Sequence, residues 1–411
     1  MTAAGAERSA PPPALAPPPG NPRFPLFDGL RAIAAISILG LHAIVFTDYF
    51  PGWQGAYARQ LAAGVCVFFV ISGFLLYRPF VASRLSGRAR IRFRDYARRR
   101  LLRIVPAYWF ALTVLMVWPG LPGDFSRDWW IYFGFAQDFQ GDTLFGGLGT
   151  AWSLGTEVSF YALLPLYAYV LSRPRFARSA RSVLVSELTV LALLALGSLG
   201  FRAAVSGSHP NLGYTLAGTF DWFALGMSLA VVSAVTVQAR SRPRAVAFVE
   251  RHSALCWAAS FGLLTTSAWY WMRTGDYEAY TAGPLHLLWG GIALFLVLPA
   301  AFSGSSVGVP QRVLRNRTVA WLGLISYGIY LWHLPLVPKV GTALDWAGVE
   351  PSGLVATGVL AALALTVTVT CAAFSYYVVE RPLLKLKERR RDRADVPARL
   401  PEPDPLPLPA D

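Results

Sequence analysis

Long apolar segments, separated by short polar loops, run along almost the whole chain. Ten of them approach or reach the length that a helix needs to cross a bilayer, which is about 20 residues. They lie near residues 30–47, 60–77, 104–118, 157–172, 183–201, 215–235, 254–271, 284–301, 319–337 and 353–378. Because a segment in lipid must satisfy its own backbone hydrogen bonds, the pattern predicts an all-α, polytopic integral membrane protein with about ten transmembrane helices.

The composition agrees with this class. Hydrophobic residues make up 55% of the 411 residues and charged residues only 15%, which lies outside the range of soluble globular domains. The net charge of +14 would suit nucleic-acid binding if it formed one basic surface. The arginines lie instead in short loops between apolar segments, so we expect the lipid bilayer, and no nucleic acid, as a partner.

The cysteines give no sign of a metal or disulfide site. Cys66, Cys256 and Cys371 all fall within apolar stretches. None belongs to a CxxC pair or to a Cys/His spacing typical of metal ligands. We therefore expect neither a disulfide framework nor a bound metal.

The loop charges alternate and so predict an orientation. The loop between the second and third segments holds ten arginines from Arg78 to Arg103 and one acid, Asp95. Every second loop after it is also basic, near Arg173, Arg240 and Arg312, as is the end of the chain from 381 to 391. The intervening loops carry more acids, which are Asp48, Asp124, Asp128, Asp138, Asp142, Asp276, Glu278, Asp345 and Glu350. Since basic loops stay in the cytoplasm, we expect a multi-pass cell-membrane protein with both termini cytoplasmic.

Three regions are expected along the chain. Residues 1–25 are rich in proline and alanine and lack the apolar core of a signal peptide, which predicts a disordered cytoplasmic tail. Residues 26–384 form the membrane domain, and 385–411 are a basic, then proline-rich, cytoplasmic tail. Within the domain, the connection 119–156 contains DWWIYFGFAQDF, which is apolar but too short to cross. We expect it to be interfacial or re-entrant.

The first apolar segment carries polar residues that are costly in lipid. Arg31 and His42 are eleven residues apart, which on a helix is three turns plus about 20°. Their side chains should therefore share one face, about 16 Å apart along the axis. A lone histidine is more often a packed, hydrogen-bonded core residue. With Asp28 and Arg31 on the same helix, a functional role is favoured.

Two clusters of ionisable residues follow from the predicted orientation. His42, Glu157, Asp221 and His333 come from four helices and are expected at similar depth in the outer half, facing one another. The alternative is a structural polar network that holds the helices together. On the cytoplasmic side, Arg31, Arg78 and the arginine-rich loop could meet an anionic ligand. For most loop arginines, contact with lipid headgroups is sufficient explanation.

A family resemblance rests on blocks spread over about residues 26–384. LFDGLRAIAAISILGLH resembles the opening of the integral-membrane acyltransferase 3 family. GVCVFFVISGFLLYRPF, RRRLLRIVPAYW, AWSLGTEVSFYALLPL, DWFALGMSLA, LGLISYGIYLWHLP and SYYVVERP follow in family order. The resemblance implies an O-acyltransferase that moves an acyl group, usually acetyl, from acyl-CoA to a hydroxyl of a glycan, glycolipid or natural product. It also implies that Arg31 and His42 carry the essential motif.

This chain departs from some relatives in two respects. It ends soon after the last apolar segment, so we expect no fused extracytoplasmic SGNH domain. Only one histidine, His42, stands where some members have two.

The chemistry of acyl transfer fits these placements. A base must take the proton of the acceptor hydroxyl, and a neutral imidazole is suited to this near pH 7, so His42 is the candidate base. Glu157 or Asp221 is expected to orient it, and His333 completes the catalytic set. Arg31, with Arg78 and Asp28, is expected to bind acyl-CoA entering from the cytoplasm. The distance from Arg31 to His42 is comparable with the reach of a pantetheine arm, and a covalent acyl-His42 intermediate stays open.

Two other classes of function compete with the enzyme. A multi-span transporter or lipid flippase would bind its substrate with the intramembrane charges, but it predicts two matching halves with broken helices, and we find no such internal repeat. A non-catalytic membrane scaffold would tolerate His42→Ala and would not bind CoA.

Overall fold

The protein is described by a computed structural model. The described residues are 24–47, 52–87, 91–123, 126–173, 179–238, 243–275, 283–302, 308–348 and 353–385. Within these ranges all regular elements are helices, which confirms the predicted fold class. The predicted tails, 1–25 and 385–411, lie outside the described residues apart from their inner ends.

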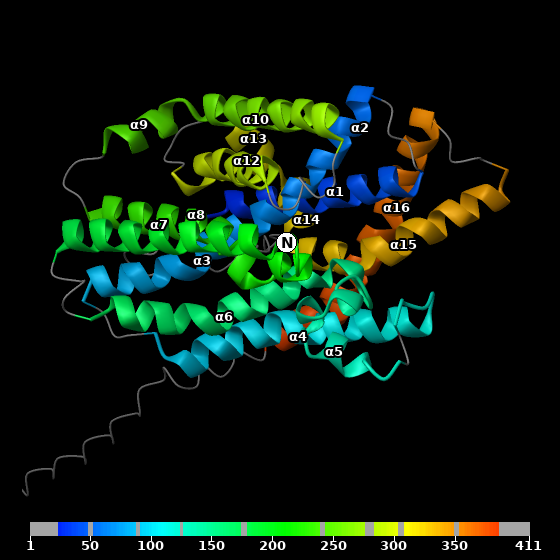
Figure 1. The fold of residues 1–411 in the computed structure, drawn as a ribbon, viewed down its shortest axis with the longest axis horizontal. Helices are drawn as coiled ribbons and strands as arrows, with labels where there is room; N and C mark the ends of the chain where they lie inside the picture. Colours follow the sequence, from blue (N-terminus) through cyan, green and yellow to red (C-terminus); the bar gives the residue numbers. More distant parts are fainter. Residues whose placement is uncertain are drawn as a thin grey trace, which may run out of the picture.

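The long helices coincide with the predicted apolar segments (Figure 1). They are α1 (Leu26–Phe46), α3 (Ala63–Leu85), α4 (Phe93–Val117), α6 (Trp152–Leu171), α7 (Ala180–Val205), α8 (Leu216–Gln238), α10 (Ser253–Thr274), α12 (Pro284–Ala301), α15 (Ser326–Trp346) and α16 (Gly353–Ser375). Shorter helices are α2 (Gly52–Arg59), α5 (Trp129–Phe133), α9 (Arg244–Arg251), α13 (Val309–Leu314) and α14 (Arg317–Leu324).

Most of these helices can cross a membrane. In the described part of the chain, eight helices are long and apolar enough, and α14 with α15 makes a ninth candidate that is bent by 71°. The segment expected at 254–271 forms α10, which has the necessary length of 22 residues but is not among those candidates. Its apolar sequence is interrupted by serine and threonine. The protein is a multi-pass membrane protein, and its described residues contain eight or nine candidate spans.

Among the described residues of 119–148, no helix is long enough to cross, and the interfacial or re-entrant character of the connection stays a prediction. The connection contains α5, of five residues, and three short 3-10 turns, Gln137–Phe139, Gly141–Thr143 and Gly149–Ala151. The predicted start of the fourth span at 157 is late, because α6 begins at Trp152 directly after the last of these turns. Glu157 therefore lies inside the helix rather than at its mouth.

Helices α3 and α8 form the centre of the bundle. They approach so closely that a Cβ added at Gly73 would overlap the backbone of Phe223, and one at Gly226 would overlap the backbone of Val70. Small residues permit this backbone-to-backbone packing between membrane helices. The ring of Phe223 also stacks on Phe69, with centroids 4.5 Å apart. This rigid pair carries side chains of α3 and α8 into the cavities described below.

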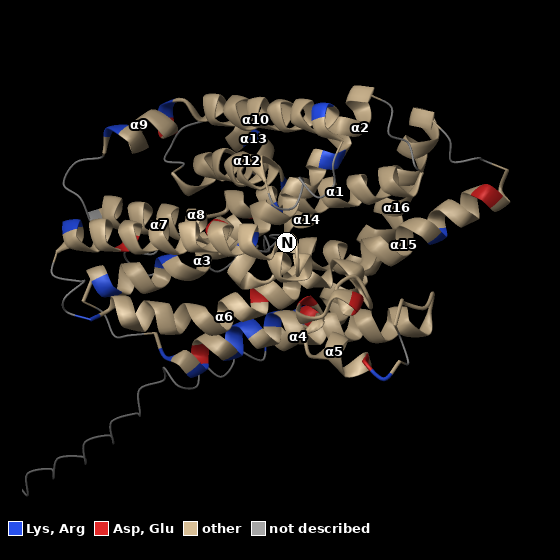
Figure 2. Ribbon diagram, viewed as in Figure 1, with Lys and Arg blue, Asp and Glu red and all other residues tan. Residues whose placement is uncertain are grey.

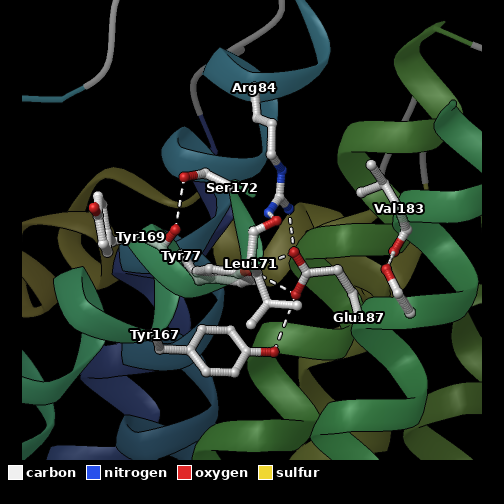
Figure 3. Close-up of polar contacts among 9 residues, drawn as sticks. Tyr77, Arg84, Tyr167, Tyr169, Leu171, Ser172, Val183 and Glu187 are labelled. Atoms are coloured by element: carbon white, nitrogen blue, oxygen red, sulfur yellow. Dashed lines mark hydrogen bonds and ion pairs between the residues drawn. The ribbon is translucent and has the colours of Figure 1, made fainter. Parts of the chain in front are cut away.

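A buried carboxylate joins three helices at the basic end of the bundle (Figure 3). Glu187 of α7 accepts hydrogen bonds of 2.6 Å from the Tyr77 hydroxyl of α3 and of 3.0 Å from the Tyr167 hydroxyl of α6. The guanidinium of Arg84 pairs with the same carboxylate and also donates to the Leu171 carbonyl at 2.7 Å. Figure 2 shows that Lys and Arg gather at this end, where α3 meets α4 and α6 meets α7, and on α9.

Candidate active site

Two histidines from different helices meet inside the bundle. His42 of α1 and His333 of α15 have their ring centroids 5.0 Å apart. His333 Nε2 lies 3.2 Å from His42 Nδ1. His42 Nδ1 is also 2.9 Å from the Ile38 carbonyl oxygen, and His333 Nδ1 is 2.9 Å from that of Tyr330. The sequence predicted these two residues as catalytic candidates, and the fold brings them into contact.

The carbonyl oxygens beside His42 and His333 indicate which ring nitrogens carry hydrogen. A carbonyl oxygen only accepts, so both Nδ1 atoms must carry hydrogen. In the neutral rings His333 Nε2 then has a lone pair, and His42 Nδ1–H donates to it. The second ring nitrogen of His42, Nε2, is consequently the unprotonated one. It is therefore the atom of the pair that can accept a proton from a ligand.

A cavity of about 360 Å³, which we call the His42 cavity, adjoins this histidine. It lies among α1, α3, α8, α12, α15 and the turn before α6. Polar side chains at its wall are His42, Thr150, Arg202, Thr219 and His286, and aromatic side chains are Phe145, Trp152, Tyr214, Trp222, Trp289 and Tyr330. Such a mixture of ring faces and a few polar groups is typical of small-molecule sites.

A second cavity, of about 190 Å³, adjoins Arg31 and is called the Arg31 cavity. Its charged lining residues are Arg31, Arg100, Arg103 and Glu157. Arg31 Nη1 pairs with Asp28 Oδ1 at 3.1 Å. The Nε atom of Arg100 is buried and has no hydrogen-bond partner among the described residues. Three guanidinium groups against one carboxylate make this cavity suited to an anion.

The two cavities share part of their walls. Val65 and Tyr330 line both of them. The Tyr330 hydroxyl is held by Ser153 Oγ at 2.7 Å and by the Thr150 carbonyl oxygen at 2.9 Å, so the ring is fixed between the cavities. A ligand that occupied both cavities would pass this tyrosine.

Two predicted partners of His42 lie elsewhere. Glu157 lines the Arg31 cavity and accepts a 2.5 Å hydrogen bond from Ser72. It is deeper than expected because α6 begins five residues before the predicted span. Asp221 Oδ2 lies 2.8 Å from Nε2 of His286, not from His42. The expected single cluster of four groups is therefore divided among three places.

Arg78 lies apart from the Arg31 cavity. It is only 1% exposed, its Nε donates to Ser233 Oγ at 3.1 Å, and its guanidinium lies 5.0 Å from the Phe24 ring centroid. It is not among the residues that line either cavity. Its role in binding the acyl donor stays a prediction.

Some site residues were not singled out from the sequence, although Arg100 and Arg103 belong to the arginine-rich loop that was expected to meet an anionic ligand. Arg100 and Arg103 are three residues apart in RRRLLR, so helical periodicity could have placed both on one face. His286 is one of five histidines and lies in an apolar segment, which could have marked it as well. In the part of the chain that the structure describes, no group of three or more His, Cys, Asp or Glu is arranged to hold a metal.

Comparison with known proteins supplies a family and relatives. A family model described as an acyltransferase domain, acyltransferase 3, matches residues 25–378. The chain is 26% identical over 388 residues to the candidate peptidoglycan O-acetyltransferase YrhL of Bacillus subtilis. It is 23% identical over 383 residues to the peptidoglycan O-acetyltransferase OatA of Listeria monocytogenes, and 27% identical over 399 residues to nodulation protein 10 of Rhizobium leguminosarum.

The extent of these matches differs. Each covers 88% of this chain, but 55%, 56% and 93% of the three relatives in that order. The chain thus spans about half the length of the first two. No solved structure matches the chain.

Proposed function

The chain belongs to the acyltransferase 3 family, and we propose that it is an acyltransferase that moves an acyl group, expected to be acetyl, from acyl-CoA to a hydroxyl of a carbohydrate, glycolipid or glycosylated natural product. One observation carries this proposal. A histidine with an unprotonated nitrogen adjoins one cavity, and that cavity shares a wall with a second, cationic one.

The chemistry of the Arg31 cavity suits part of the acyl donor, its phosphates and the neighbouring aliphatic arm. Its three guanidinium groups suit phosphate oxygens, and the unpaired Nε–H of Arg100 lacks the acceptor that a bound anion would supply. The apolar side chains of Phe68, Leu75 and Leu76 suit an aliphatic arm. When bound, acyl-CoA would supply an acyl group activated as a thioester.

His42 acts as the base in this proposal. Its Nε2 takes the proton of the acceptor hydroxyl, which makes the oxygen nucleophilic. The Nδ1–H stays directed at the Ile38 carbonyl and at His333 Nε2, so these two acceptors stabilise the imidazolium that forms. His42 then holds a proton at Nε2 that it can return to the leaving group. His333 acts through His42 and is a positioning residue.

The distribution of arginines indicates from which side of the membrane each substrate enters. The basic end of the bundle is assigned to the cytoplasm, with both termini on that side. Arg31 is near that end of α1, so the acyl donor enters from the cytoplasm. The acceptor reaches the His42 cavity from the opposite side. The names of two relatives, peptidoglycan O-acetyltransferases, support a carbohydrate acceptor.

A comparison of strains tests the proposal. Glycans and secreted metabolites of the source cell are analysed by mass spectrometry with the gene deleted, restored, and restored as His42→Gln. Restoration should return an O-acyl group that both the deletion and the variant lack. If the variant restores the group fully, or if deletion changes no acylated product, the proposed function is wrong.

A further inference from the structure

His286 presents an unused hydrogen-bonding atom at the His42 cavity. It lies in the first turn of α12, is 2% exposed, and lines the cavity. Its Nε2 is 2.8 Å from Asp221 Oδ2 of α8, and its ring stacks on Trp222 at 4.1 Å between centroids. Its Nδ1 is buried without a hydrogen-bond partner among the described residues.

The carboxylate assigns the proton on His286. An ionised Asp221 only accepts, so Nε2 carries the hydrogen and Nδ1 of the neutral ring carries a lone pair. A buried polar atom left without a partner costs about 1–3 kcal/mol. Native proteins seldom leave such an atom unsatisfied unless a ligand or water completes it. Because His286 lines the His42 cavity, a ligand in that cavity that donates a hydrogen bond would complete this nitrogen.

The aromatic wall indicates what kind of ligand this is. The indole N–H of Trp222 donates to the His286 carbonyl oxygen at 3.2 Å, and that of Trp289 donates to Gln60 Oε1 at 3.0 Å. Trp152 packs edge-on against Tyr214, with centroids 4.9 Å apart. The indole N–H groups of Trp222 and Trp289 are thus both occupied by hydrogen bonds within the protein. What they offer a ligand is carbon surface, which suits the C–H faces of a sugar ring.

The size of the cavity agrees with this ligand class. Its volume of about 360 Å³ falls within the range of roughly 300–1,000 Å³ for small-molecule sites. Aromatic rings, the His286 imidazole with its unprotonated Nδ1, and the His42 base all line this cavity. A ligand with several hydroxyl groups on an apolar ring satisfies all three.

We propose that the Asp221–His286 pair is a recognition site for the acceptor sugar. His286 Nδ1 accepts a hydrogen bond from a sugar hydroxyl other than the one that His42 deprotonates. Asp221 fixes the tautomer of His286 and is a positioning residue. The inference rests on the proposed acyl transfer. It adds the class of acceptor, a sugar, and the side chain that recognises it, His286. A sugar that lacks this hydroxyl leaves Nδ1 unpaired and is rejected.

The test uses acceptors that differ by one hydroxyl. The purified full chain in nanodiscs receives acetyl-CoA and hexyl β-D-glucoside, hexyl N-acetyl-β-D-glucosaminide, or their single-deoxy analogues. Acetylated glycoside and released CoA are both measured. For the wild type, one deoxy analogue that keeps the acetylated hydroxyl should have kcat/KM at least tenfold below its parent.

The variants then connect that hydroxyl to His286. His286→Phe keeps a ring against Trp222 but has no acceptor atom. It should raise KM for the parent glycoside about tenfold or more, leave KM for acetyl-CoA unchanged, and abolish the discrimination against the deoxy analogue. Asp221→Leu should also weaken the discrimination, because without the carboxylate no acceptor holds the proton of His286 on Nε2. His252→Gln, at the boundary of α9 and α10, is the matched control and should behave as wild type.

The outcomes separate this inference from the function on which it rests. If the wild type releases no CoA and acetylates nothing, the acyl-transfer proposal fails. If the wild type acetylates a glycoside but His286→Phe keeps the same KM and the same discrimination, acyl transfer stands and the recognition site is wrong. If CoA release depends on His42 but no glycoside increases it, the assignment of a sugar to this cavity is wrong.

Discussion

At the level of single residues, the proposed reaction depends on which nitrogen of each histidine is protonated. The Ile38 carbonyl and His333 both occupy Nδ1 of His42, so Nε2 stays free for the reaction. On His286, Asp221 accepts the hydrogen bond of Nε2–H, so Nδ1 is the nitrogen that can accept a hydrogen bond from a ligand. Two imidazoles at one cavity thus expose different nitrogens, and each has a different role in the proposed transfer.

Arg103 is predicted to bind the acyl donor without contributing to the chemical step. A contact to phosphate away from the reacting carbon is equal in ground and transition states, so its loss raises KM and leaves kcat unchanged. Hydrogen bonds to charged groups contribute about 1.5–3 kcal/mol, which corresponds to a rise of roughly 10–100-fold in KM for Arg103→Ala. Steady-state kinetics with acetyl-CoA measures it.

Arg98→Ala is the matched control, because Arg98 is exposed on the same helix and does not line the Arg31 cavity. A loss of kcat with unchanged KM in Arg103→Ala would place Arg103 at the reaction centre instead.

Helical periodicity predicted the shared face of Arg31 and His42 on α1, because spacing along one helix fixes direction. Contacts between helices could not be predicted in the same way. The partner of Asp221 depends on how α8 and α12 face each other, and the depth of Glu157 depends on where α6 begins. A shift of five residues moves a side chain by about 7.5 Å along a helix, which was enough to separate Glu157 from His42.

At the scale of elements, Glu187 holds α3, α6 and α7 together and was not identified from the sequence. Glu187→Ala leaves Arg84 without its buried counter-charge, which is expected to destabilise the fold by about 3–5 kcal/mol. Tyr77→Phe, which removes one hydrogen bond to Glu187, should cost only about 1 kcal/mol. Thermal unfolding in detergent measures both. Asp345→Ala, at an exposed position, is the control. If Glu187→Ala unfolds at the same midpoint temperature as this control, Glu187 does not have the proposed role.

The turn that contains Asp138 makes stability depend on pH. Burial of Asp138, which is 2% exposed, raises the pKa of its carboxyl to about 8. Its Oδ2 accepts a long 3.4 Å hydrogen bond from the Thr156 hydroxyl, and the backbone of Thr156 also donates to this carboxyl, but burial outweighs both. Between about pH 4 and pH 8 the folded state therefore keeps a proton that the unfolded state loses. The contribution of Asp138 to the free energy of unfolding should fall by about 1.4 kcal/mol per pH unit across this window. It should be constant above about pH 8.

Asp138→Asn removes the titration and tests this prediction. The difference in unfolding midpoint between Asp138→Asn and wild type should increase from pH 5 to pH 8. A difference that is constant with pH would show that Asp138 is ionised in the folded protein.

At the scale of the whole molecule, topology follows from the arginine pattern. The loops that begin near Arg84, Arg173, Arg240 and Arg312 are predicted to be cytoplasmic. Arg240 and the opposite loop at Asp276 lie outside the described residues. Single cysteines introduced in these loops, in a chain without the three native ones, should divide by side when labelled with an impermeant reagent. Labelling at Asp276 on the same side as Arg88 would contradict the topology.

In the proposed reaction His42 takes the proton of the acceptor hydroxyl, and the variant His42→Gln removes that ability. Glutamine keeps similar size and hydrogen bonding but cannot accept a proton at neutral pH. Loss of a positioned base typically costs 10²–10⁴-fold in rate, on the order of 3–5 kcal/mol of barrier. The measurement is acyl transfer from acetyl-CoA by purified, correctly inserted protein. We expect a loss of this size in kcat with unchanged binding of acetyl-CoA. Near-normal turnover of His42→Gln would contradict it and make His42 a structural residue.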